Sequence, residues 1–220
     1  MKILSIEESK QIATKFLKHI GKYNKEEVER YFSKKSLILR LPIISFFAQL
    51  FIKKYREYNK EIYSIPLSWP VTKGQVQKYE DFLCFHDLEY KFFTDKEFFK
   101  TIQKTLKKHN INRLFAISPI WNFYYGKLIY KHAITFSVDE LDKEQPPLFF
   151  QLARCRPGYC VLFDTCIFSE DFSFLFILST EFTADLFGPK EFISDFKSNY
   201  PNYIKYLNMD EMKRVSNLLK

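Results

Sequence analysis

The chain has 220 residues, of which 46% are hydrophobic and 19% aromatic, and only 5 are glycine. This composition excludes a disordered or fibrous protein, and so few glycines argue against a glycine-rich nucleotide-binding fold. The net charge of +8 is uneven, because residues 1–110 carry 22 Lys and Arg against 13 Asp and Glu, whereas residues 111–220 carry 12 against 13. The lysines alternate with acidic residues rather than forming runs, which favours solvated helix surfaces.

The first half of the chain is predicted to be mostly helical. Ser5–Glu8 forms a capping box ahead of apolar residues at helical spacing, and Gly21 ends that pattern. Asn24 opens a second helix and Thr94 opens another. Between these two, a helix is predicted over residues 74–90.

The most apolar stretch covers residues 37–52 and is flanked by lysines. As a helix it would be roughly 24 Å long, shorter than a hydrocarbon layer of about 30 Å. It also contains Arg40 and Pro42. We therefore expect a buried core helix here and no membrane as a partner.

The second half of the chain carries strand-like patterns. Runs rich in Phe, Val, Ile and Thr predict strands over residues 113–118, 129–138, 148–154, 159–169 and 172–179. Short turns join the later runs, so we expect antiparallel pairing. The last run is apolar at both alternations, which is typical of a central strand that is covered on both faces.

Helices are predicted again after residue 179. A short helix over residues 180–188 would end at Gly188, and Pro189 suits the start of the next helix. The predicted buried face of that helix consists of Phe192, Ile193 and Phe196. Residues 209–219 are expected to form a C-terminal amphipathic helix.

This order of elements predicts an α+β fold. We expect a single domain over residues 1–220, with a helical part at 1–110 and an antiparallel sheet of about five strands plus C-terminal helices at 111–220. The sequence has no Gly/Ser linker and no internal repeat.

The four cysteines are predicted to be free thiols that pack in the core. No secretory signal is visible at the start of the sequence, so we expect a cytoplasmic location and reduced thiols. Their spacing matches no common zinc pattern, and no metal-binding residues are predicted. The cysteines are Cys84, Cys155, Cys160 and Cys166.

No catalytic motif is present, and the sequence therefore favours a binding protein over an enzyme, with no catalytic residues and no cofactor. Cys84 and His86 are the densest candidate pair, but on a helix two residues apart they would point to different sides. Glu170 and Asp171 suit ordinary turn chemistry. An enzyme with a site dispersed along the chain, including His86 or His132, remains an alternative.

Two segments are candidates for partner binding. An acidic loop between two strands concentrates negative charge in a basic chain and could steer a basic partner, although it could equally be a solvated, mobile loop. Its candidate residues are Asp139, Glu140, Asp142 and Glu144. An aromatic segment between the first two predicted strands could provide interface anchors, unless it is buried under the sheet. Its candidate residues are Trp121, Tyr124 and Tyr125.

Nucleic-acid binding by the basic helical N-terminal half is the second functional hypothesis. Stacking of bases on a sheet needs aromatic and basic side chains on one strand face. Here the predicted strands carry the aromatic residues, but almost all the lysines lie in the helical half. Nucleic acid is therefore a possible but disfavoured partner.

The C-terminal third resembles a known family. From Asp171 the sequence reads DFSFLFILSTEFTADLFGPKEFI, with Phe196 and Pro201 after it. This is similar to the C-terminal layout of bacterial toxin-immunity proteins from contact-dependent inhibition and related polymorphic toxin systems: a hairpin strand, a Ser/Thr-acidic helix start, a glycine and a helix carrying Phe-Ile. The resemblance covers residues 171–201.

The resemblance implies a small, cytosolic, non-catalytic protein. Such a protein binds one cognate toxin domain in a heterodimeric complex and blocks its active site or substrate path. Immunity proteins against nucleases are often acidic, whereas this chain has a charge of +8. Either the acidic loop provides the contact locally, or the toxin is not a basic nuclease.

Overall fold

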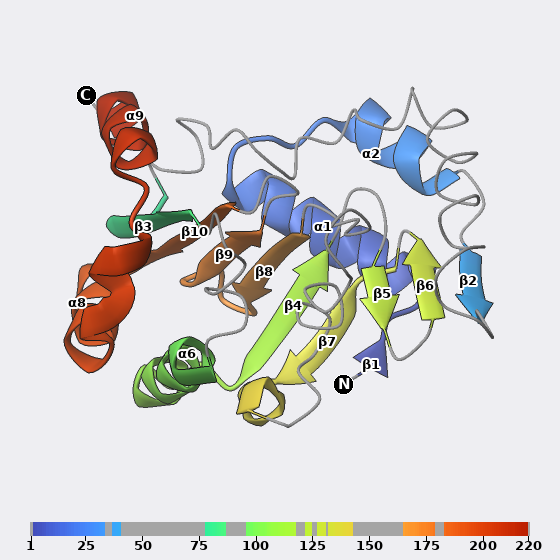
Figure 1. The fold of residues 1–220 in the computed structure, drawn as a ribbon. Helices are drawn as coiled ribbons and strands as arrows, with labels where there is room; N and C mark the ends of the chain where they lie inside the picture. Colours follow the sequence, from blue (N-terminus) through green and yellow to red (C-terminus); the bar gives the residue numbers. More distant parts are fainter. Residues whose placement is uncertain are drawn as a thin grey trace, which may run out of the picture.

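A computed structural model of the chain describes residues 2–33, 37–40, 78–86, 96–117, 122–124, 127–130, 132–142, 165–178 and 183–219. Its strands form two antiparallel sheets (Figure 1). The larger has seven strands in the order β1 (Lys2–Ile3), β7 (Ile134–Ser137), β4 (Arg113–Ile117), β8 (Thr165–Ser169), β9 (Leu175–Leu178), β10 (Thr183–Gly188) and β3 (Asp81–His86). The smaller has the order β2 (Leu37–Arg40), β6 (Lys127–Tyr130) and β5 (Asn122–Tyr124).

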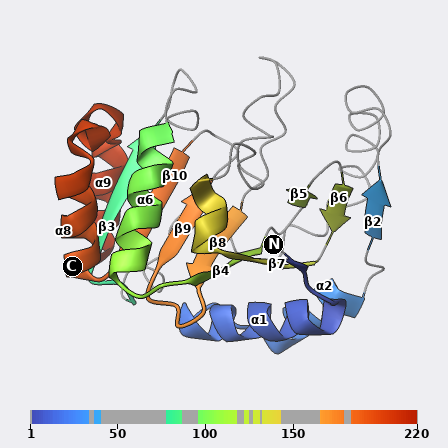
Figure 2. The same ribbon diagram turned by 90° about the horizontal axis from the view of Figure 1, so that it is seen from below.

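Helices cover both faces of the seven-stranded sheet (Figure 2). One face, called the α1 face below, packs against α1 (Ile6–His19) and α2 (Lys25–Ser33). The opposite face, called the α6–α8 face, packs against α6 (Lys96–Lys108) and α8 (Lys190–Asn199). The 3-10 helix η1 (Val138–Asp142) follows β7, and η2 (Pro201–Tyr206) and α9 (Met209–Leu219) follow α8.

The helix starts predicted at Ser5 and Asn24 are confirmed. At the third predicted start, Lys96 and Glu97 lie in α6, and Thr94 lies outside the described residues. The Ser5 hydroxyl accepts from the Glu8 amide at 3.2 Å, and the Ser5 amide donates to the Glu8 carboxylate at 2.7 Å. The Asn24 side chain accepts from the amides of the next turn in the same way, at 3.0 and 3.2 Å. These bonds satisfy amides that have no partner within a helix, which is why the sequence pattern locates the helix starts well.

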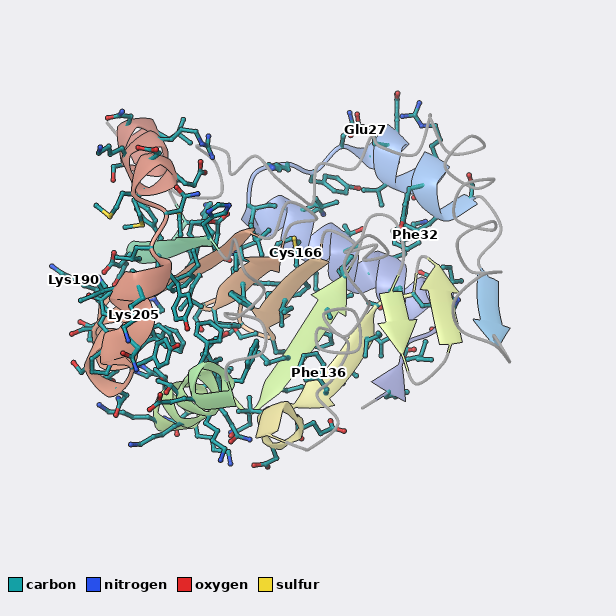
Figure 3. The ribbon with its side chains drawn as sticks, in the orientation of Figure 1. Glu27, Phe32, Phe136, Cys166, Lys190 and Lys205 are labelled. Atoms are coloured by element: carbon teal, nitrogen blue, oxygen red, sulfur yellow. The ribbon has the colours of Figure 1, made fainter. Side chains whose placement is uncertain are left out.

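The hydrophobic core has two layers, one on each side of the sheet. On the α1 face, Phe16 stacks on Phe168 with ring centroids 4.3 Å apart. On the α6–α8 face, the buried Phe98 contacts other aromatic rings in edge-on and tilted arrangements, namely Phe85, Phe99, Phe176, Phe196 and Tyr200. Figure 3 labels one residue of each layer, Cys166 on the α1 face and Phe136 on the α6–α8 face.

Strand β9 lies between β8 and β10, and its residues belong alternately to the two layers. The central, doubly covered strand predicted within residues 172–179 is therefore confirmed. The buried face predicted for α8 is also confirmed, because Phe192, Ile193 and Phe196 are fully buried. Residues 209–219 form a helix as expected.

The helix predicted over residues 74–90 is wrong where the structure describes it. Asp81–His86 is strand β3, and it pairs with β10 over its whole length. Four consecutive residues, 82–85, are buried because helices cover both faces of the sheet. A continuous apolar run of this kind also fits part of a helical periodicity, so the sequence pattern does not separate the two.

The helix predicted over residues 180–188 is also wrong, because Thr183–Gly188 is strand β10. Gly188 does not end a helix. A Cβ atom there would lie 3.0 Å from a ring carbon of Phe192, so the missing side chain lets α8 pack closely against the end of the strand.

These two strands change the predicted sheet. It has seven strands rather than about five, and the first half of the chain supplies β1, β2 and β3 besides its helices. The coarse class of α+β stands. In the apolar stretch 37–52, residues 37–40 form β2 rather than a helix, and the rest lies outside the described residues, as does the strand predicted at 148–154. In the described part of the chain, no helix combines the length and the apolar character needed to cross a bilayer.

The segment that leads into α9 covers β3, which is an edge strand of the large sheet (Figure 1). Leu207 forms an isolated antiparallel bridge with Phe85, and the Asn208 amide donates to the Cys84 carbonyl at 2.9 Å. The Cys84 amide in turn donates to the Met212 sulfur at 3.2 Å. Edge strands expose unpaired amides and carbonyls, and here part of that edge is satisfied by the chain itself.

Candidate functional site

The acidic segment predicted as a loop begins with a 3-10 helix, η1, which lies against α6. Asp139 pairs with Lys107 at 2.5 Å while 71% of its side chain stays exposed. The Glu140 carboxylate accepts from the Ser137 amide at 2.9 Å. The first two acidic residues therefore have structural roles in holding η1. The side chain of Asp142 and the whole of Glu144 lie outside the described residues.

The aromatic segment is not a connection between strands where it is described. Asn122–Tyr124 is itself strand β5, and the backbone of Tyr124 pairs with Lys127 of β6. Trp121, Tyr125 and the side chain of Tyr124 lie outside the described residues. Whether these aromatic residues face a partner stays a prediction.

Cys84 and His86 lie on strand β3, so residues two apart point to the same side of the sheet. The geometric reason given for separating them on a helix is therefore wrong. Cys84 is nevertheless fully buried, and burial followed by the nearby charge of Asp185 raises the pKa of its thiol far above its usual value. A thiol that stays protonated is a poor nucleophile.

The Cys84 thiol is hydrogen-bonded to the carboxyl group of Asp185, its cross-strand neighbour on β10. Asp185 is only 1% exposed, and its Oδ1 atom has no hydrogen-bond partner. Burial raises the pKa of Asp185 to about 7, opposed by the Cys84 hydrogen bond. The nearby α9 residues Glu211 and Arg214 raise and lower it, respectively. No pattern in the sequence indicates this site, because a single aspartate among apolar residues is typical of an exposed position.

A second pair of polar atoms is buried without partners on the same α1 face. The His19 Nε2 and the Tyr79 hydroxyl have no hydrogen-bond partner, and their rings lie 6.0 Å apart. Burial lowers the pKa of His19, with a further contribution from Lys78, and burial raises the pKa of Tyr79 beyond its usual range. Both groups are therefore held in their neutral forms.

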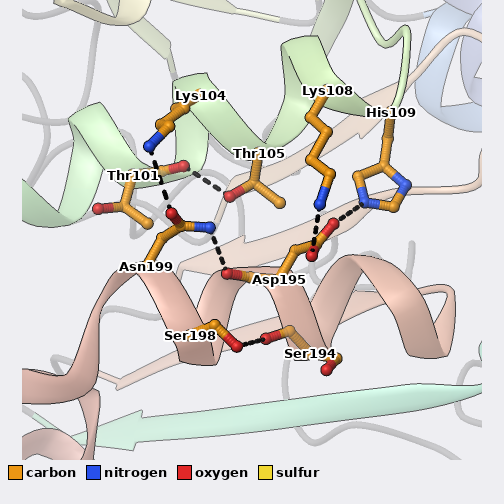
Figure 4. Close-up of polar contacts among 9 residues, drawn as sticks. All are labelled: Thr101, Lys104, Thr105, Lys108, His109, Ser194, Asp195, Ser198 and Asn199. Carbon is orange, nitrogen blue, oxygen red and sulfur yellow. Dashed lines mark hydrogen bonds and ion pairs between the residues drawn. The ribbon is translucent and has the colours of Figure 1, made fainter.

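The α6–α8 face presents a different polar surface (Figure 4). The Asp195 carboxylate of α8 accepts from Lys108 at 2.7 Å and lies 2.8 Å from the His109 ring. The Lys108 and His109 hydrogen bonds hold the pKa of Asp195 below its usual range. Lys104 reaches Asn199 at 3.3 Å. These lysines, part of the basic excess of residues 1–110, are thus engaged in bonds within the molecule.

An exposed apolar surface lies at the connection of η2 and α9. Among the described residues, the large hydrophobic side chains that are exposed are Tyr23, Ile204 and Met209, and the last two are 65% and 57% exposed. Tyr203 and Tyr206 beside them are partly buried against the core, and Lys205 of the same turn is labelled in Figure 3. We call Ile204 and Met209 the η2–α9 surface.

Sequence reasoning missed the η2–α9 surface. Met209 has the same helical phase as Met212 and Val215, so the pattern predicts it on the buried face of α9. It is nevertheless 57% exposed, whereas Val215 is fully buried.

Comparisons of the chain with protein-family models, curated proteins and solved structures gave no match.

Proposed function

We propose that this chain is a protein-binding inhibitor, most concretely an immunity protein that neutralises a cognate bacterial toxin domain by blocking its active site or substrate path. It acts in the cytoplasm, without catalysis of its own. The observation that carries the proposal is the η2–α9 surface, where Ile204 and Met209 are exposed on either side of Leu207, which is bridged to the sheet edge. Methionine and aromatic residues are enriched in protein interfaces.

The resemblance of residues 171–201 to immunity proteins supports the same function, although the middle part of this segment is strand β10 rather than a helix start. What remains of the layout is the β8–β9 hairpin and α8 with its buried Phe-Ile pair. The η2–α9 surface follows directly after these elements. A partner that docks there would meet a rigid frame, which limits the entropy lost on binding.

Asp139 provides a second, charged contact in this proposal. Its carboxylate is mostly exposed although it pairs with Lys107, and rim charges of this kind affect the rate of association more than the affinity. The paired lysines of α6 favour protein over nucleic acid as the partner, because bonds within the molecule already engage their charges.

The test is co-expression with the toxin domain encoded beside the gene of this chain. We expect the wild-type chain to co-purify with that domain and to protect cells that express it. A variant carrying Ile204→Asp and Met209→Asp should weaken the complex by at least about tenfold, since buried apolar anchors dominate interface energies. Tyr23→Asp is the matched control, because Tyr23 is an exposed apolar residue outside this surface, and it should leave the complex intact.

Absence of both the complex and the protection would overturn the proposed function. An undiminished complex with the double variant would overturn the choice of surface. Retention of DNA or RNA with an affinity that falls steeply with added salt, together with no toxin binding, would replace the proposal with nucleic-acid binding by the basic N-terminal half.

A further inference from the structure

Asp185 lies where α9 meets the sheet. Its side chain is on the α1 face of β10, between Cys84 of β3 and Ile177 of β9, and it is 1% exposed. Its carboxyl group interacts with the Cys84 thiol, and its Oδ1 atom has no hydrogen-bond partner among the described residues. A buried carboxylate without strong donors is expensive to keep ionised, so this position favours the protonated acid.

Cys84 of β3 forms hydrogen bonds with α9 and with the residue that precedes it. Its carbonyl accepts from the Asn208 amide, its amide donates to the Met212 sulfur, and its thiol donates to Asp185. Val215, one turn after Met212, is fully buried in the layer that contains Cys84. The residues that hold α9 against the sheet therefore also surround Asp185.

The charged and titratable groups that act on Asp185 come from β3 and α9, and β9 supplies the apolar Ile177. From β3 comes the Cys84 thiol. From α9 come Glu211, which is 7% exposed, and Arg214, whose guanidinium donates to the Glu211 carboxylate at 2.8 and 2.9 Å. Glu211 repels a charge on Asp185 and Arg214 attracts it, and because these two are paired, their effects partly cancel.

We propose that Asp185 and α9 form a proton-controlled latch on the edge of the sheet: α9 docks on β3 most tightly while Asp185 carries a proton, and it opens more often as Asp185 ionises. Opening of α9 brings water to the carboxylate and removes the need to bury its charge. The latch can be tested without the proposed toxin, because it needs only this chain, although Met209 of the η2–α9 surface belongs to the same helix.

The direction of the pH effect follows from linkage. In the docked state the pKa of Asp185 is raised to about 7, whereas the pKa of a solvated aspartate lies near 3.8. The docked state therefore binds the proton more tightly. As pH rises from about 4 to 7, the equilibrium constant for opening should increase by up to about tenfold per pH unit, and it should level off above about 7.

The experiment is hydrogen exchange of the wild-type chain between pH 5 and 8.5, corrected for intrinsic rates. The amides of Cys84, Asn208 and Val215 report on the latch, and those of Leu175–Leu178 in β9 report on global opening. We expect protection at the latch to fall about fivefold from pH 6 to 7 and to be flat above pH 8. It should stay below the protection of β9 at every pH.

Asp185→Asn should make the latch protection independent of pH across this range. Asp195→Asn is the matched control, because it removes a carboxylate from the α6–α8 face, and it should keep the wild-type profile. A flat wild-type profile would overturn the latch, whether or not Asp185→Asn folds. So would protection of α9 equal to that of β9, because α9 would then open only with the whole molecule.

Discussion

The two faces of the seven-stranded sheet bury similar aromatic layers but differ in whether their polar groups are hydrogen-bonded. On the α6–α8 face, the buried Thr105 hydroxyl donates to a helix carbonyl at 2.8 Å, and Asp195 is bonded to two side chains. On the α1 face, three buried side-chain atoms of the described residues have no hydrogen-bond partner, in His19, Tyr79 and Asp185. Buried polar groups are normally bonded, so each exception in a folded protein needs a physical explanation.

The difference indicates which face of the sheet should be more stable and which face should respond to pH. The α6–α8 face combines dense aromatic packing with satisfied polar groups, and we expect it to be the firm part of the fold. The α1 face places ionisable groups in an apolar layer beneath α9 and at the end of α1, so its stability depends on their protonation.

The largest expected effect comes from breaking the aromatic layer of the firm face. Phe98→Ala removes a fully buried ring that contacts five other aromatic rings. It should lower the free energy of unfolding by about 3–5 kcal/mol, measured by urea denaturation. A loss below about 1 kcal/mol would show that this layer is loosely packed.

The next effect concerns the acid on the α1 face. Because the pKa of Asp185 is raised to about 7 in the folded chain, the contribution of this residue to the free energy of unfolding is most favourable at low pH. It is lost between about pH 4 and 7, at up to about 1.4 kcal/mol per pH unit. Asp185→Asn should therefore raise the free energy of unfolding above pH 7 by a few kcal/mol. Denaturation of both proteins at pH 5 and pH 8 checks this, and a variant that is less stable at pH 8 would contradict it.

The smallest effect compares one hydroxyl on each face. Tyr79→Phe removes a buried hydroxyl without a partner and should stabilise the chain by about 1 kcal/mol. Thr105→Val removes a bonded hydroxyl and should destabilise it by about the same amount. Thermal unfolding measures both. Destabilisation by Tyr79→Phe would mean that its hydroxyl does have a partner, and the contrast between the faces would be weaker.

The parts of the fold that follow from local chemistry could be predicted from the sequence. The capping box at Ser5 and the side-chain cap at Asn24 locate α1 and α2, because side chains a few residues away satisfy the first amides. The strands β3 and β10 could not be predicted in this way. Their burial depends on helices from distant parts of the chain, and the helix expected over residues 180–188 is based only on Thr180–Glu181 as a start and Gly188 as a stop.

The candidate sites show the same limit. Asp139 and Glu140 were recognisable as an acidic cluster, but their bonds to Lys107 and to the Ser137 amide depend on where α6 packs. The η2–α9 surface has an ordinary amphipathic pattern, and that pattern does not separate the exposed Met209 from the buried Val215. A pattern along the chain indicates which residues are apolar or charged, and tertiary packing decides which of them are available.

The most direct test of the contrast between the two faces is the titration of the Asp185 carboxyl carbon by NMR, assigned with the Asp185→Asn variant. We expect a midpoint near pH 7, because burial on the α1 face raises the pKa of this group to about 7. A midpoint below about pH 5, as for an aspartate in contact with water, would contradict the account. It would mean that the α1 face does not hold the Asp185 carboxyl group in an apolar environment without strong donors.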